Sequence, residues 1–524
     1  MGDRVSNNAL FSGLKSGCYI ALIALPLCLG IAMASSCPPI AGVITAIVGG
    51  LVASFFGGCR LSIKGPAAGL IVIVMATVVD LGAGDLTAGY KRMLAVGVVA
   101  AAIQIIFALI GAARLGKLMP PSVIHGMLAA IGVIIISKQI HILVGNPPQG
   151  KTTFELISEI PHSIANINPE LTFIGIFTLL CMILLPLIPS RITKTIPPAA
   201  IALLIVVPLG LYWQLLVPHA YEFFGHTFQV GPKALVNIPE SFLSSLVFPD
   251  FAILLDWHAY KYVAMLALVG SVESVLTVIA VDSMGKSKSD LNRDLLGVGV
   301  GNLVAAMIGG LPMISEVVRS KANIDNGARD QWSNFFHGAV LLLAVCFLDP
   351  LIREIPLAAL AAMLMVTGVR LASPSMFFKT YSIGRDQLLL FMTTMCVTLA
   401  SDLLMGVIAG IVLKLFVHFV RGLKPNNLIV SPVKVTQEAS NTRIALQGPA
   451  VFSNYFSVQK HIQEALKLPK PVVVDFSKAT LVDHTTLSSL YSLVDEIGAE
   501  KLILVGLDKL KPLSKHRLST HRYA

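Results

Sequence analysis

The sequence predicts a polytopic α-helical membrane protein with a small α/β domain at its C-terminal end. Hydrophobic residues make up 55% of the 524-residue chain, charged residues only 13%, and the mean hydropathy is +0.79. Soluble domains carry about 25% charged residues, so most of this chain belongs in lipid. The formal net charge of +10 is spread over short loops, where membrane topology accounts for it, and a nucleic-acid partner is therefore not expected.

Apolar runs fill the chain up to residue 421, and a span needs roughly 20 apolar residues. They number about fourteen, and some are too short to cross the bilayer alone. The runs lie at about 17–34, 40–57, 66–80, 92–112, 119–143, 171–188, 197–216, 259–282, 295–309, 313–324, 335–349, 356–371, 386–400 and 402–420.

Lysine and arginine gather in alternate loops, which the positive-inside rule places in the cytoplasm. With an even number of spans, both termini are then cytoplasmic, and the chain is a multi-pass protein of the cell membrane. The long connections around 145–170 and 217–257 lie on the opposite side. The basic residues behind this prediction are Arg60, Lys64, Arg114, Lys117, Arg191, Lys194, Lys286, Lys288, Arg293, Arg370, Lys379, Arg385, Arg421 and Lys424.

An internal repeat divides the membrane part into two halves. The pattern LVASFFGG at Leu51–Gly58 recurs as LVAAMIGG at Leu303–Gly310, and a proline break follows each copy. Seven spans per copy, an odd number, give the halves opposite orientations, which predicts 7+7 inverted repeats at about 12–216 and 258–421. In such transporters the broken helices meet near the midplane, with their N-terminal ends directed at an anion.

The two breaks supply the candidate anion site. A Gly-Pro break is often a packing kink, but two breaks that follow the same eight-residue pattern favour a binding site. The residues at the predicted half-helix starts are Pro66, Ala67 and Ala68 in the first half and Met313, Ile314 and Ser315 in the second.

Acidic residues near these breaks suggest ion coupling. Glu273 lies inside an apolar helix, where a carboxylate is costly and usually marks an ion pathway, and Thr277 follows on the same face. A neutral carboxylic acid bonded to the bundle is the alternative for Glu273. Glu316 adds a second acid, which would repel an anion unless Na⁺ or H⁺ intervenes, or which pairs instead with Arg319 three residues on.

Beyond Lys424 the apolar runs give way to the alternation of a soluble domain. Strands are expected at Thr442–Leu446, Pro471–Phe476 and Leu502–Gly506, and an amphipathic helix at Phe456–Leu468. This order indicates a small α/β domain over 425–524, after a transport domain over 1–424.

Two groups of residues resemble the signatures of the sulfate permease (SulP) family of solute carriers. They are Asn292–Asn302 (NRDLLGVGVGN) with Gly310-Leu311-Pro312, and Ala24–Leu27 with Gly65-Pro66-Ala67. The resemblance covers essentially the whole chain. It implies a core domain that moves against a gate domain, a cytoplasmic STAS domain at 425–524, and a homodimer that assembles through the STAS and membrane domains.

The resemblance also implies roles for single residues. Glu273 falls on the acidic position of span eight, Thr277 on a sodium-ligand position, and Arg319 on the arginine that follows the tenth half-helix. Pro66 and Ala67 fall on the anion-facing position of span three. A departure is Ser315-Glu316, where many members have small residues.

In the stretch Asp483-His484-Thr485-Thr486, Thr485 falls on the position that is phosphorylated in regulatory STAS domains. The glycine of that loop is missing here. A structural, dimerising role for the domain is therefore favoured over regulation.

These features predict a secondary active transporter of small inorganic anions, with Na⁺- or H⁺-coupled uptake of bicarbonate or sulfate by an elevator-like alternating-access mechanism. An exchanger of chloride, bicarbonate, sulfate or dicarboxylates and a passive, channel-like or sensory conductor remain alternatives. The chain has no GxxxxGK[ST], HExxH or GxSxG motif, so no enzymatic activity is expected. No cofactor is expected beyond a coupling Na⁺, for which Glu273 and Thr277 are the candidate ligands.

Overall fold

The computed structural model describes residues 7–113, 116, 119–150, 152–188, 195–239 and 242–523. The chain forms two compact units, one of residues up to Gly116 together with Ile131–Leu371, the other of Lys117–Ala130 with Ala372–Ala524. Helix α6 (Pro121–Leu143) contributes to both. Packing groups the last helices before residue 424 with the C-terminal part, and the boundary of the transport domain at 424 stays a prediction. Of the basic loop residues, Arg114, Lys117, Arg191 and Lys194 lie outside the described residues.

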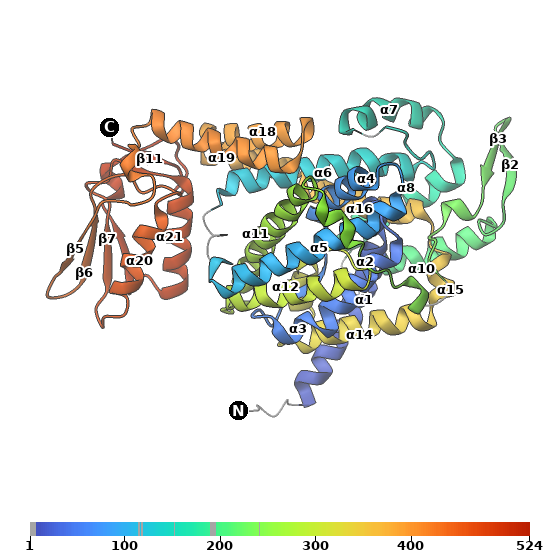
Figure 1. The fold of residues 1–524 in the computed structure, drawn as a ribbon, viewed down its shortest axis with the longest axis horizontal. Coiled ribbons are helices and arrows are strands. Elements are labelled where there is room, and N and C mark those ends of the chain that lie inside the picture. Colours follow the sequence, from blue (N-terminus) through green and yellow to red (C-terminus); the bar gives the residue numbers. More distant parts are fainter. Residues whose placement is uncertain are drawn as a thin grey trace. The chain divides into compact units, whose positions relative to one another are not determined.

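Helices dominate the first unit (Figure 1). Helices α1, α2 and α14 pack against one another, and α5 packs along α12. A Cβ on Gly50 would lie 2.5 Å from the Cα of Gly338, so the backbones of α2 and α14 touch as only small residues allow. The helices are α1 (Asn7–Ala34), α2 (Pro39–Leu51), α3 (Ala53–Phe56), α4 (Ile71–Gly82), α5 (Leu86–Leu109), α7 (Thr153–Ala165), α8 (Pro169–Leu184), α10 (Pro198–Tyr212), α11 (Ala259–Gly285), α12 (Leu291–Met307), α13 (Val317–Asp325), α14 (Trp332–Phe347), α15 (Asp349–Arg353) and α16 (Leu357–Leu371).

Seven helical segments among the described residues are long and apolar enough to cross a membrane. They are Leu10–Ala34, Leu86–Leu109, Pro121–Leu143, Pro169–Leu187, Ala259–Gly285, Leu357–Ile383 and Leu403–Val420. Four shorter apolar helices, Pro39–Leu51, Ala68–Gly82, Pro198–Tyr212 and Trp332–Phe347, accompany them. The count of fourteen spans stays a prediction, because several predicted runs form short or broken elements.

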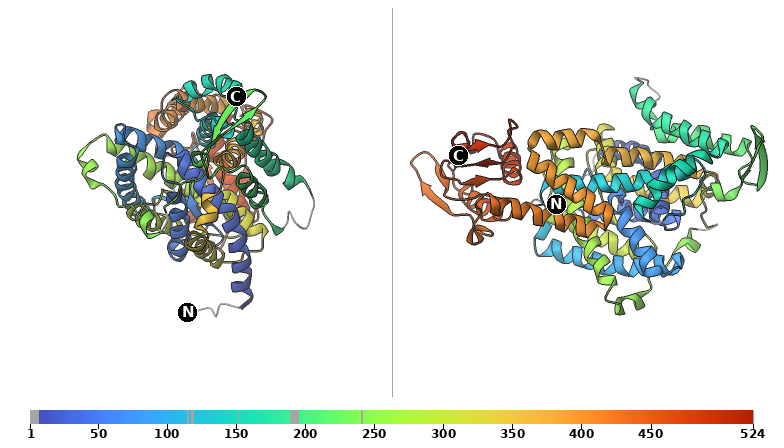
Figure 2. Two further views of the ribbon diagram at one scale, coloured as in Figure 1. Left: turned by 90° about the vertical axis from the view of Figure 1, so that its right-hand side faces the viewer. Right: turned by 90° about the horizontal axis from the view of Figure 1, so that it is seen from above.

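The two long connections carry structure of their own. The first holds α7, which is tied to the last turn of α6 because His141 Nδ1 lies 2.7 Å from Ser163 Oγ. The second holds a hairpin of β2 (His219–Phe223) and β3 (His226–Val230), which extends away from the helices of the first unit in both Figure 1 and Figure 2.

The second unit contains α17 (Pro374–Ile383), α18 (Arg385–Ala400) and α19 (Leu403–Val420) together with an α/β fold. Its main sheet has the order β5-β6-β7-β9, from β5 (Val433–Gln437), β6 (Thr442–Leu446), β7 (Val472–Asp475) and β9 (Leu502–Val505). Only the β5–β6 pair is antiparallel. Helices α20 (Tyr455–Ala465) and α21 (His484–Ile497) cover the sheet, and β8 (Leu481–Val482), β10 (Lys511–Pro512) and β11 (His521–Arg522) form a small second sheet. The three predicted strands and the predicted helix are therefore confirmed.

Candidate functional site

The two proline breaks come together as an antiparallel ribbon of β1 (Ile63–Pro66) and β4 (Met313–Glu316). Pro66 lies opposite Met313, and Ile63 lies opposite Glu316. The sequence predicts helix starts at both breaks. In the first half this is confirmed for Ala68, which begins a 3₁₀ turn, but Pro66 and Ala67 are extended. In the second half it is wrong, because Met313, Ile314 and Ser315 all belong to the extended strand. Proline donates no N–H and favours an extended residue before it, so the chain enters each helix only after the break.

The helices begin a few residues later and leave the ribbon at opposite ends. A 3₁₀ turn at Ala68–Leu70 leads into α4, and α13 begins at Val317. Directly opposed residues of a ribbon share a face, so Lys64, Pro66, Met313 and Ser315 lie on one side. Residues of the other set, including Gly65, Ile314 and Glu316, lie on the other side.

Glu273 of α11 is buried beside the start of α4. A Cβ on Gly69 would lie 2.2 Å from its Oε1 and 2.4 Å from its Oε2, so the carboxyl group rests directly on the Gly69 backbone. Oε1 has no hydrogen-bond partner among the described residues. Thr277 is buried one turn further along the same helix.

Arg319 of α13 is 2% exposed, and its guanidinium lies over Gly65 on the Glu316 face of the ribbon. It also lies beside the thiol of Cys28. Nη1 of Arg319, Oε1 of Glu316 and both ring nitrogens of His337 have no hydrogen-bond partner in the part of the chain that the structure describes. Buried polar groups are normally paired, so this concentration of unpaired atoms makes the Glu316 face of the ribbon the candidate binding site.

The acids and the arginine form an electrostatic group. Glu273 and Glu316 interact with each other, and Glu316 interacts with Arg319 and with the backbone of Ala68. No ion pair between Glu316 and Arg319 occurs within 4 Å in the described residues. With both acids ionised the group carries one negative charge in excess, and it becomes neutral when one acid binds a proton or a cation.

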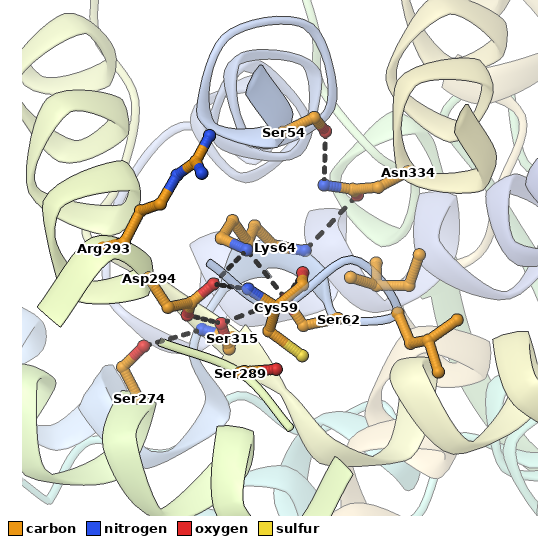
Figure 3. A network of polar contacts seen from close by, with 12 residues as sticks. Ser54, Cys59, Ser62, Lys64, Ser274, Ser289, Arg293, Asp294, Ser315 and Asn334 are labelled. Carbon is orange, nitrogen blue, oxygen red and sulfur yellow. Dashed lines mark hydrogen bonds and ion pairs between the residues drawn. The ribbon is translucent and has the colours of Figure 1, made fainter. Parts of the chain in front are cut away.

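The opposite face of the ribbon holds a second charged cluster, shown in Figure 3. Lys64 and Asp294 of α12 are each 1% exposed and form an ion pair with 2.9 Å between Nζ and Oδ1. The Ser315 hydroxyl donates to Asp294 Oδ2 at 3.0 Å, so it faces this pair. The expectation that Lys64 is a cytoplasmic loop residue is wrong, because it is a buried ribbon residue whose charge Asp294 compensates.

Asn302 of α12 holds the first residue of β4. Its Oδ1 accepts from the Met313 N–H at 2.6 Å and its Nδ2 donates to the Met313 carbonyl at 3.1 Å. Nδ2 also donates to Gln104 of α5. Backbone groups of Met313 are thus used within the fold, while Pro66, Ala67 and Ile314 contribute buried apolar surface and Ala68 is partly exposed.

Thr485 belongs to the second unit and lies far along the chain from these residues. Its hydroxyl accepts a hydrogen bond from Lys414 of α19, whose Nζ also lies 2.8 Å from Oδ2 of Asp483. Thr485 is buried, so a kinase would reach it only if α19 and α21 separated. Its regulatory role stays a prediction.

Sequence reasoning missed Lys64, Asp294, Asn302 and His337 as members of the central polar group. Asp294 and Asn302 lie in the quoted NRDLLGVGVGN motif, and their eight-residue spacing in a helix was a usable signal. Lys64 could have been found as a lysine directly before the Gly65-Pro66 break. No cluster of three or more His, Cys, Asp or Glu suited to a metal ion occurs among the described residues, so a Na⁺ ion would depend on hydroxyl and carbonyl oxygens as well.

A bundle of apolar helices, interrupted by a ribbon at a buried polar centre, has the fold of a helical membrane transporter. The model of the Sulfate permease family matches residues 10–394, and the chain belongs to this family.

Relatives and solved structures agree with this membership. The chain is 25% identical to the bicarbonate transporter BicA of Picosynechococcus sp. over 93% of its own length and 82% of that protein. It is 24% identical to the sodium-independent sulfate anion transporter of Bos taurus, over 95% and 84% of the two chains. The solved transmembrane domain of a cyanobacterial BicA matches 78% of this chain and 98% of that domain, with a TM-score of 0.63 and 25% identity.

Proposed function

We propose that this chain is a secondary active transporter that carries bicarbonate or sulfate into the cell, coupled to Na⁺ or H⁺. The observation that carries the proposal is the group of unpaired buried atoms around the β1–β4 ribbon, where Arg319 offers a cation and Glu273 and Glu316 offer two acids. Family membership and the names of the relatives support an anion as cargo. An elevator-like movement of one helix group against another is the mechanism that the resemblance suggests.

The charge arrangement favours coupling over passive conduction. Arg319 and the backbone N–H groups at the start of α4 attract an anion, whereas two carboxylates oppose one. Binding Na⁺ or H⁺ at Glu273 or Glu316 removes this opposition, so anion and cation bind more tightly together than separately. For Na⁺, the unpaired Oε1 of Glu273 and the hydroxyl of Thr277 would be ligands, since hard cations prefer oxygen.

Several finer features belong to the same proposal. They are fourteen spans in two inverted repeats, cytoplasmic termini, a STAS domain at 425–524 and a homodimer. The antiparallel pairing of the two breaks supports the inverted repeats, and the mixed α/β fold of the C-terminal part supports the STAS domain.

Uptake into liposomes tests the function. Purified protein should accumulate labelled bicarbonate or sulfate above the external concentration when a Na⁺ or H⁺ gradient is imposed. Accumulation that ignores both gradients would instead favour an exchanger, and downhill flux alone a channel.

Glu273→Gln should abolish coupled accumulation while the protein remains folded, because the amide cannot bind a proton or carry the negative charge that holds Na⁺. Thermal unfolding of the detergent-solubilised variant is the control for folding. Normal accumulation by this variant would show that Glu273 is structural.

A further inference from the structure

Lys64 and Asp294 neutralise each other's charge on one face of the ribbon. On the other face, Oε1 of Glu316 and Nη1 of Arg319 have no hydrogen-bond partner among the described residues. Asp294 accepts three hydrogen bonds, from Lys64 Nζ at 2.9 Å, from the Cys59 N–H at 3.0 Å and from the Ser315 hydroxyl at 3.0 Å. Lys64 Nζ also donates to Ser62 Oγ at 2.7 Å. Such a pair is expensive to bury, so its presence one residue from the Gly65-Pro66 break calls for a role.

The cluster joins both strands of the ribbon to α12 and α14, and Figure 3 shows its residues. Asp294 comes from α12, Lys64 from β1 and Ser315 from β4, and Lys64 lies directly opposite Ser315 in the register. The backbone N–H of Lys64 donates to Oδ1 of Asn334 in α14 at 3.3 Å. Asn334 Nδ2 in turn donates to Ser54 Oγ at 2.8 Å and to the Gly49 carbonyl at 3.0 Å.

Contacts from outside the ribbon must fix the register in which β1 pairs with β4, because the two strands are too short to fix it themselves. Each strand has four residues, Pro66 donates no backbone hydrogen bond, and a two-stranded ribbon is marginal by itself. A shift of one residue would exchange the faces, turning Glu316 toward Asp294 and Ser315 toward Arg319. A shift of two residues would keep the faces but remove Ser315 from its place opposite Lys64.

We propose that Lys64 and Asp294 are positioning residues that fix the register of β1 on β4. Through the register they set where Glu316, Arg319 and the start of α4 lie around the transported anion, although neither residue touches it. The consequence for transport rests on the function proposed above, whereas the consequence for the ribbon does not.

The double variant Lys64→Met/Asp294→Leu separates positioning from stability. Replacement of a buried ion pair by apolar side chains of similar size is often neutral for stability, but here the Cys59 N–H and the Ser315 hydroxyl lose their acceptor. The melting temperature should therefore fall only modestly, and the protein should remain folded. Amide hydrogen exchange in the segments 59–70 and 311–320 should become faster, by about tenfold, because the register is no longer held. The KM for sulfate uptake should rise by a similar factor, about tenfold, at an unchanged protein level.

A matched control removes an ion pair away from the ribbon. Arg353 and Asp349 of α15 are paired at 3.3 Å, and Arg353→Met/Asp349→Leu should change neither KM nor the exchange of the two segments. The charge swap Lys64→Asp/Asp294→Lys should not restore KM, because the donors on Cys59 and Ser315 would then face an ammonium group.

Unaltered exchange in 59–70 and 311–320 in the Lys64→Met/Asp294→Leu variant would overturn the proposal, and so would full recovery of KM in the charge swap. If the double variant does not fold, Ser315→Ala removes one link to Asp294 without a charge change, and the same two segments should still exchange faster. If the unaltered protein takes up neither sulfate nor bicarbonate, the proposed function fails, while the exchange measurement still tests the register.

Discussion

Gly69→Ala should displace the carboxyl group of Glu273 without breaking the fold. A Cβ at position 69 would lie 2.2 Å from Oε1 and 2.4 Å from Oε2, whereas ordinary contacts begin at 3.4 Å, so the carboxyl group must retreat by about 1.2 Å. The φ angle of Gly69 lies outside the left-handed region, so the backbone accepts alanine. Overpacking of this kind costs about 1–3 kcal/mol of folding stability.

The functional loss should exceed the loss of stability, because a displacement near 1 Å at a reacting or binding group can cost on the order of 100-fold in rate. The assay is the initial rate of gradient-driven sulfate or bicarbonate uptake into liposomes, beside a thermal unfolding curve. Gly97→Ala is the control, since its Cβ would meet only the Ala306 Cβ at 3.4 Å.

A rescue distinguishes displacement from general damage. Glu273→Asp shortens the acid by one methylene and leaves space for the new methyl group, so Gly69→Ala/Glu273→Asp should transport better than Gly69→Ala alone. Wild-type uptake by Gly69→Ala would refute the close packing of Glu273 on α4, and an additive double variant would refute the coupling between the two positions.

Two further predictions concern Arg319 and the second unit. Gly65→Ala would place a Cβ 2.5 Å from Arg319 Nη1, so apparent anion affinity should fall while Gly97→Ala leaves it unchanged, as measured by the concentration dependence of uptake. Asp483→Ala should destabilise the second unit by about 3–5 kcal/mol, because it leaves the buried Lys414 without the carboxylate that pairs with its charge. Burial alone would raise the pKa of Asp483, but the charge of Lys414 and the contacts with His418 outweigh burial and hold that pKa below its usual range. The stabilisation is therefore present above the unfolded pKa of about 3.9 and is lost only as the pH falls through the lower folded pKa. Thermal unfolding against pH checks this, with the exposed Asp495→Ala as control; a stable Asp483→Ala protein at neutral pH would contradict it.

The membrane class and the pairing of the two breaks were predictable because both depend on local pattern. Apolar runs identify spans by length and composition, and a repeated eight-residue pattern before two prolines indicates equivalent positions in two halves. In the second unit, β6 and β7 were found within a residue of their ends because each is a short strand in which buried and partly exposed residues alternate.

The conformation at the breaks was not predictable in the same way. Helix starts were expected at Pro66 and Met313, but extended pairing satisfies the backbone groups of β1 and β4 where neither strand could do so alone. That pairing joins residues about 250 positions apart. A strand of four residues is also too short to show an alternating hydrophobic pattern in the sequence. Lys64 was misassigned for the same reason, since a single lysine in a loop and a lysine paired with a distant Asp294 look alike in sequence.

The two faces of the β1–β4 ribbon differ in how their polar groups are paired. On the face of Lys64 and Ser315, charges and donors are matched within the fold, and a matched cluster resists rearrangement. On the face of Glu316, the unpaired atoms of Glu316 and Arg319 would be costly in a protein that never binds anything there. If the proposed transport takes place here, an ion can enter and leave the site only when the surrounding backbone keeps its register while the site is empty. Under the proposed function, the compensated pair and the unpaired group are parts of one arrangement, in which stability on one face permits reversible binding on the other.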